Sequence, residues 1–167
     1  MSPVPISETL VAGLGNPLMG DDGIGPAVVA RLESRGVPVG LRAVDVGSDV
    51  SRLAHIWNGE PSIWLVDAVE AENAPGAMVR LEHSQLVALP GGQSSSHGLS
   101  VSDNLRWLLH GLPDLRTVEF TLWGIVPESV CHRPTLTATA DRAVDNLASE
   151  LLRRFEETRL TGSKSKR

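Results

Sequence analysis

The stretch 10–25 constrains the fold of this chain more than any other part of it. It reads L-V-A-G-L-G-N-P-L-M-G-D-D-G-I-G, an apolar run followed by closely spaced glycines and two adjacent aspartates. Because glycine allows positive φ angles and close backbone contacts, this pattern predicts a strand, a tight turn and the start of a helix. In an open α/β sheet, ligands bind at the loops that follow such strands. We therefore expect a ligand site at this loop.

The glycines do not complete a dinucleotide-binding fingerprint. Gly13 and Gly15 match the start of G-x-G-x-x-G, but Leu18 occupies the position of the third glycine. Asp21 and Asp22 would also lie at the start of the helix, where backbone N–H groups donate hydrogen bonds to a bound phosphate. Their negative charges would disfavour a phosphate at this position. We expect one aspartate to cap the helix and the other to be available to a cation. A nucleotide-binding dehydrogenase is therefore the least favoured class.

Strands and helices alternate along most of the chain. Apolar runs predict further strands at 41–46, 62–69, 77–82 and 117–126, and apolar residues at helical spacing predict helices at 24–34, 49–57, 99–109 and 140–158. The third and fourth strands are expected to form a hairpin. The pattern predicts an α/β protein, a single layered domain with a twisted, mainly parallel sheet of about five strands and helices on both faces.

Composition narrows the class of protein. With 167 residues, 41% of them hydrophobic, the chain predicts one globular domain over 1–160. Residues 161–167 contain three basic and no acidic side chains, and we expect them to form a disordered tail. The formal net charge of -5 argues against a nucleic-acid partner. The start of the chain has no basic region followed by an apolar run, so neither a signal peptide nor a membrane partner is predicted.

The single cysteine, Cys131, excludes an internal disulfide framework and favours the reducing cytoplasm. Its neighbour is His132. Adjacent residues rarely face each other as a nucleophile and its base, so a thiol mechanism is not favoured. The chain also has no G-x-S-x-G nucleophile elbow.

Three candidate metal ligands come from separate strand ends and loops. Asp22 follows the first strand, Asp67 is near the carboxyl end of a buried apolar strand, and His97 follows a loop rich in glycine and serine. Two carboxylates and an imidazole suit a divalent ion such as nickel or zinc, with coordination positions left open. Spacing alone leaves a structural aspartate and an ordinary loop histidine as alternatives. We expect the other histidines, His55, His83, His110, to be at the surface or in packing contacts.

A series of motifs follows in order along residues 10–152. They are G-L-G-N-P-L-M-G-D-D-G-I-G at 13–25, V-D-V-G-S around Asp45, L-V-D-A-V around Asp67, A-P-G at 74–76, S-H-G-L-S around His97, and G-I-V-P-E-S at 124–129. With these motifs the chain resembles the maturation endopeptidases of nickel-iron hydrogenases. That family trims a C-terminal extension from the hydrogenase large subunit after nickel insertion.

The resemblance implies a site and a reaction. Asp22, Asp67 and His97 would correspond to the metal-binding triad of the family, and Asp45 to an acid that assists catalysis. It implies a cytoplasmic, aspartyl-type endopeptidase whose partner is a hydrogenase large-subunit precursor. The nickel would be supplied by that substrate, and no organic cofactor would be needed.

Two other functions compete with this interpretation. A nickel-binding assembly chaperone for hydrogenase could use the same three ligands without cleaving a peptide bond. Peptidyl-tRNA hydrolases share the start of the Gly-Leu-Gly-Asn-Pro motif, but their motif continues into a tyrosine, and this chain has no tyrosine. The acidic charge also disfavours tRNA. The chaperone is therefore the stronger alternative.

Overall fold

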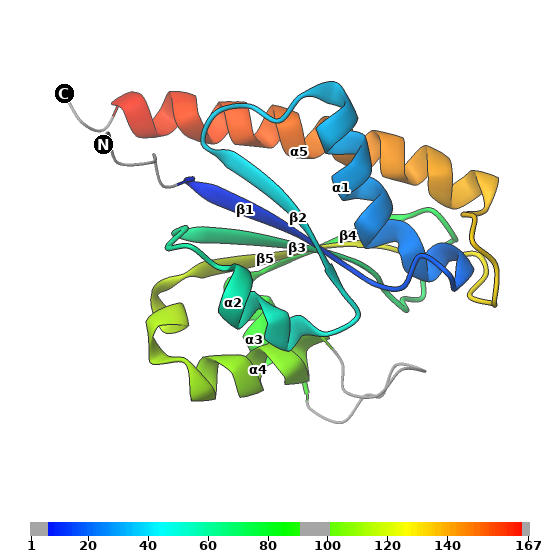
Figure 1. Cartoon of the computed structure of the whole chain (residues 1–167), viewed down its shortest axis with the longest axis horizontal. Coiled ribbons are helices and arrows are strands. Elements are labelled where there is room, and N and C mark those ends of the chain that lie inside the picture. The colour runs from blue at the N-terminus through cyan, green and yellow to red at the C-terminus, as the bar shows by residue number, and fades with distance from the viewer. Residues whose placement is uncertain (1–6, 91–100, 165–167) are drawn as a thin grey trace.

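The computed structural model describes residues 7–90 and 101–164, and these residues contain one five-stranded sheet (Figure 1). The strands are β1 (Thr9–Leu14), β2 (Leu41–Gly47), β3 (Ser62–Ala68), β4 (Met78–Glu82) and β5 (Glu119–Ile125). Their order across the sheet is β2-β1-β3-β5-β4, with β4 antiparallel to β5 and the other neighbours parallel. The predicted α/β class and mainly parallel sheet are confirmed.

Helices cover both faces of this sheet. Figure 1 shows α1 (Ile24–Arg35) and α5 (Ala138–Lys164) on one face, and α2 (Leu53–Ile56), α3 (His83–Ala88) and α4 (Val101–Gly111) on the other. Short 3-10 helices η1 (Gly20–Gly23), η2 (Val50–Arg52) and η3 (Pro113–Thr117) join these elements. Among the helices in the described ranges, none combines the length and the apolar character that a membrane crossing requires.

Two helical segments differ from the sequence prediction. Helix α3 was not expected, and α5 continues past 158 to Lys164, into the segment predicted as a disordered tail. Past 158, the Thr161 hydroxyl donates to the carbonyl of Glu157 over 3.1 Å, and the Arg159 guanidinium donates to the carbonyl of Val39 over 3.3 Å. The predicted helix end at 158 was therefore too early by six residues.

The central strand β3 explains why its sequence is almost continuously apolar. Trp64 and Val66 pack in the cluster formed with α1 and α5, whereas Ile63 and Leu65 belong to the cluster on the face of α3 and α4. Both faces of a strand covered by helices must be apolar. A carboxylate at the end of this strand, Asp67, is consequently held close to a dry core.

The predicted hairpin between the third and fourth strands is wrong. Strand β5 lies between β3 and β4 and pairs with both of them. The burial of the strands gives the reason: β5 is buried at nearly every position, whereas β4 alternates between exposed and partly exposed residues. A strand with exposed side chains is suited to the edge of a sheet, and a strand with buried apolar side chains is suited to its interior.

Close contact between β1 and α1 depends on glycine. A Cβ atom on Gly25 would lie 2.1 Å from the carbonyl oxygen of Leu14 and 2.7 Å from that of Val66. Both contacts involve backbone atoms that cannot rotate away. Gly25 therefore allows the first turn of α1 to lie directly on β1 and β3.

Gly25→Ala is expected to lower the free energy of unfolding by about 3 kcal/mol or more, because the new methyl group overpacks rigid backbone. Urea unfolding followed by circular dichroism measures this loss. Gly111→Ala is the matched control, since a Cβ at Gly111 meets nothing within 4 Å. Equal stability of the two variants would contradict the proposed close contact.

Candidate functional site

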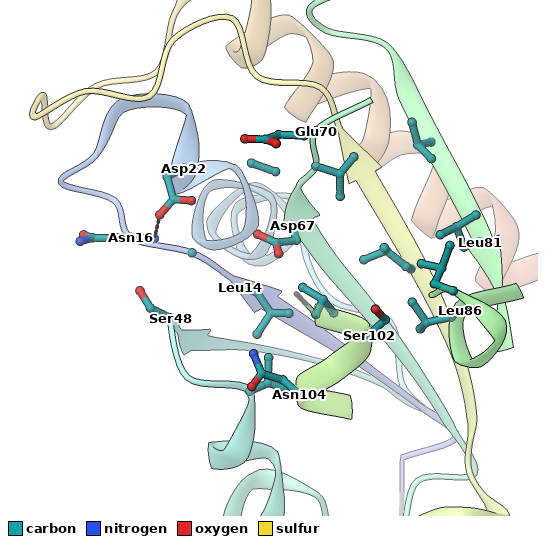
Figure 2. Close-up of a pocket in the computed structure, with 18 of the residues that line it drawn as sticks. Leu14, Asn16, Asp22, Ser48, Asp67, Glu70, Leu81, Leu86, Ser102 and Asn104 are labelled. Carbon is teal, nitrogen blue, oxygen red and sulfur yellow. Dashed lines mark hydrogen bonds between the residues drawn. The ribbon is translucent and has the colours of Figure 1, made fainter. Parts of the chain in front are cut away.

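The loop after β1 places Asp22 at the carboxyl edge of the sheet. Gly15 has a φ of 129°, and a Cβ there would lie 1.9 Å from the carbonyl oxygen of Asp22. The backbone N–H of Asn16 donates to Oδ2 of Asp22 over 2.9 Å, as Figure 2 shows. The loop thus folds back on η1 and holds the Asp22 carboxylate by one oxygen. The other oxygen, Oδ1, accepts no hydrogen bond from the described residues.

The neighbouring Asp21 has a different role. Its side chain is fully buried and accepts hydrogen bonds from the backbone N–H groups of Glu128, Ser129 and Thr137, and from the Thr137 hydroxyl, over 2.7 to 3.1 Å. These donors belong to the segment between β5 and α5. The expectation that one aspartate caps the following helix is wrong, because Asp21 instead joins η1 to this distant segment and neither side chain caps η1 or α1.

Hydrogen bonding decides the charge of Asp21. Burial alone would raise the pKa of Asp21, but the hydrogen bonds from Thr137, Ser129 and Glu128 outweigh burial and hold that pKa below the ordinary value of 3.8. Because the folded state binds this proton more weakly than the unfolded state, the stabilisation is present above pH 3.8 and is lost as the pH falls through the lower, folded pKa.

Asp21→Asn is expected to cost about 2–4 kcal/mol of unfolding free energy at pH 7, because an amide cannot accept all four hydrogen bonds. The difference from the wild type should narrow below about pH 4. Urea unfolding from pH 7 to pH 3 measures both effects. Asp114→Asn is the control, because Asp114 is exposed in η3. A difference that stays constant down to pH 3 would rule out the ionised carboxylate as its source.

Asp67 ends the apolar run of β3 and faces Asp22 across the same edge. The side chain is only partly exposed. Burial, and secondly the negative charge of Asp22, raise the pKa of Asp67 to about 8. With no cation near it, Asp67 is therefore mostly protonated at neutral pH. A pair of carboxylates in this condition is an electrostatic arrangement suited to a metal ion.

Asp22 and Asp67 line one pocket of about 680 Å³. A third carboxylate, Glu70, lines it as well, and Figure 2 shows these acids on one side of the pocket with Leu81 and Leu86 on the other. The pocket lies at the carboxyl ends of β1 and β3, where an α/β sheet binds its ligands. A pocket is therefore present at the loop after β1, where a ligand site was expected.

Of the other two predicted site residues, Asp45 does not line this pocket and His97 cannot be assigned to any part of it. Asp45 is exposed near the end of β2 and accepts a hydrogen bond from the backbone N–H of Gly47 over 2.9 Å. Ser48, three residues further along the chain, lines the pocket, whereas Asp45 does not. His97 lies outside the described residues. Within 7–90 and 101–164, no three His, Cys, Asp or Glu side chains come close enough together to hold a metal ion.

The remaining histidines have the ordinary roles that were expected. His55 and His110 are exposed on helices. His83 packs on Phe120 with ring centroids 6.0 Å apart, and its Nδ1 accepts the backbone N–H of Phe120 over 3.1 Å. Cys131 is exposed and its Sγ lies 3.7 Å from the Ser129 hydroxyl, with no histidine base contacting it among the described residues.

Fold and pocket together define an α/β protein with an acidic pocket at the carboxyl edge of a mainly parallel sheet. The family model described as hydrogenase maturation protease matches residues 26–154. The hydrogenase 2 maturation protease of Escherichia coli K12 is 31% identical over 155 residues, which cover 89% of this chain and 91% of that protein.

Solved structures agree with this match. The hydrogenase maturating endopeptidase HybD from Escherichia coli superposes with a TM-score of 0.75 at 28% identity, covering 90% of this chain and 93% of that one. The [NiFe] hydrogenase maturation protease HybD from Thermococcus kodakarensis gives a TM-score of 0.70 at 26% identity, over 89% and 98% of the two chains. This chain belongs to the hydrogenase maturation protease family, a family of endopeptidases.

Proposed function

We propose that this protein removes the C-terminal extension of a nickel-iron hydrogenase large subunit after nickel has been inserted. Asp22, Asp67 and His97 recognise the nickel while it is bound in the substrate, so that only a loaded precursor is cut. No organic cofactor takes part. The reaction takes place in the cytoplasm, the compartment that a single cysteine favours.

The observation that carries this proposal is the pair of carboxylates in one pocket. Without a cation, burial and the charge of Asp22 keep Asp67 protonated, with a pKa of about 8. A divalent ion between the two groups would remove their repulsion and allow both to ionise. Two carboxylates and a histidine also leave coordination positions for groups of the substrate.

The position of His97 in the chain is consistent with this ligand set. Pro90 and Val101 are the described residues that flank the segment containing His97, and both line the same pocket as Asp22 and Asp67. The described chain therefore stops and resumes at the pocket, on either side of the stretch that carries the histidine. His97 as the third ligand remains a prediction, as does the assisting role of Asp45.

In the proposed reaction, water adds to the carbonyl carbon of the scissile peptide bond. A site carboxylate accepts a proton from the water, the carbon–nitrogen bond breaks, and the proton passes to the leaving amine. The substrate's nickel polarises the carbonyl and helps to position the water. The products are the mature subunit with a new C-terminus and a short peptide.

A nickel-binding assembly chaperone remains the second candidate, because the same ligands could bind a loaded precursor without hydrolysis. Mass spectrometry of candidate large-subunit precursors, nickel-loaded and nickel-free, separates the two functions after incubation with the protein. We expect loss of a C-terminal peptide from the loaded form alone. Tight binding with no loss from any loaded precursor would favour the chaperone.

A further inference from the structure

The two sides of the acidic pocket have different chemistry. Five of the apolar residues that line the pocket come from the β3–β4 connection, β4, the end of α3 and the start of α4; we call them the apolar wall: Val69, Val79, Leu81, Leu89, Val101. A site that bound only a metal ion would need no such surface. We therefore expect the ligand to have a second, apolar group that contacts the wall.

The wall is accessible from the pocket. All five residues are partly exposed, with Leu89 the most exposed at 37%, whereas the pocket-lining Leu86 and Leu122 are buried at 0% and 5% exposure. Exposed apolar side chains gathered in a concave pocket beside polar groups are typical of a binding site, unlike single apolar residues scattered over a surface. The buried leucines support the wall from behind and keep its shape.

Charge around the wall restricts what can occupy it. The carboxylates of Asp67 and Glu70 line the same pocket as the wall. An acidic side chain would lose its hydration on the wall and be repelled by the Glu70 carboxylate. An apolar side chain avoids both costs and gains free energy from burial.

We propose that the apolar wall receives an apolar side chain of the C-terminal extension of the precursor. This inference rests on the proposed function. The groups that bind nickel stay in the mature part of the substrate and lie over Asp22 and Asp67. The space beyond Asp67 is then left for the chain on the other side of the scissile bond, which is the extension.

Kinetics of cleavage by wall variants test the proposal. Val79→Thr keeps the shape of the side chain but adds a hydroxyl, and Leu89→Ser removes an exposed apolar group. In the Val79→Thr/Leu89→Ser double variant we expect the KM for a nickel-loaded precursor to rise about tenfold while kcat stays within about twofold. This is the pattern expected when the lost contact stabilises the bound substrate and the transition state equally. Trp107→Ala is the control, because Trp107 is 70% exposed on α4 and does not line the pocket.

A double-mutant cycle identifies the occupant of the wall. Each apolar residue of the extension is replaced singly by Ser, and each precursor is cleaved by the wild type and by the double wall variant. At one position of the extension, the Ser substitution should lower kcat/KM for the wild-type enzyme but have little effect with the double wall variant. The variant has already lost the contact between the wall and that side chain. Thermal unfolding confirms that the variant remains folded.

Two results would overturn the inference. Additive effects at every position of the extension, or an unchanged KM in the double wall variant, would show that the wall does not contact the extension while cleavage itself stands. Failure of the wild type to cut any loaded precursor would instead reject the proposed function, and the inference with it.

Discussion

Asp22→Asn is expected to lower kcat/KM for a nickel-loaded precursor by about 1000-fold or more, the effect of removing a charged ligand worth about 4 kcal/mol in the transition state. The fold should be unaffected. Asn has the same shape, and its side-chain oxygen can still accept the hydrogen bond that Asp22 takes from the backbone of Asn16. We therefore expect the unfolding temperature to change by no more than about 3 °C.

Asp49→Asn is the matched control for this variant. Asp49 accepts a backbone hydrogen bond from Ser51 over 2.9 Å in the same way that Asp22 accepts one, but it lies outside the pocket. It should retain full activity. Wild-type activity of Asp22→Asn would exclude the carboxylate from the reaction, and a large fall in unfolding temperature would assign it a structural role instead.

The fold could be predicted wherever the signal was local. The apolar run of β3 and the helical spacing of Ile24, Val28 and Leu32 in α1 depend on neighbours only a few residues away, and both elements are present. The pairing of β4 with β5 was missed because it depends on which strand gains most from a central position, a competition between segments about 40 residues apart.

The site was predictable in part for a similar reason. Asp67 could be singled out because burying a carboxylate within an apolar strand costs free energy unless the group is paired, and such a cost is typical of functional residues. Asp21 and Asp22 could not be assigned separate roles, since their difference depends on donors at Glu128, Ser129 and Thr137, more than 100 positions away. The apolar wall had no sequence signal either, because it is assembled from four separate elements.

Asp67→Asn is expected to abolish cleavage and at the same time to stabilise the protein. The ordinary pKa of 3.8 applies to the unfolded chain, whereas burial and the charge of Asp22 raise the folded pKa to about 8. The folded state therefore holds this proton more tightly, and the stabilisation present below pH 3.8 is lost as the pH rises towards 8. By pH 8 the wild type should have lost about 2–4 kcal/mol at this residue, after allowance for its partial exposure.

Asparagine cannot ionise, so it avoids this loss at every pH. Urea unfolding of the metal-free protein should show equal stability of wild type and Asp67→Asn near pH 4, and a growing advantage of the variant up to pH 8. Asp22→Asn removes only the negative charge that acts on Asp67, whereas Asp67 itself can still ionise. We therefore expect Asp22→Asn to be more stable than the wild type at pH 8, but by less than Asp67→Asn. A variant less stable than the wild type at pH 8 would contradict the raised pKa. The expected result, more stability with no cleavage, would indicate that this carboxylate is retained for the reaction at the expense of the fold.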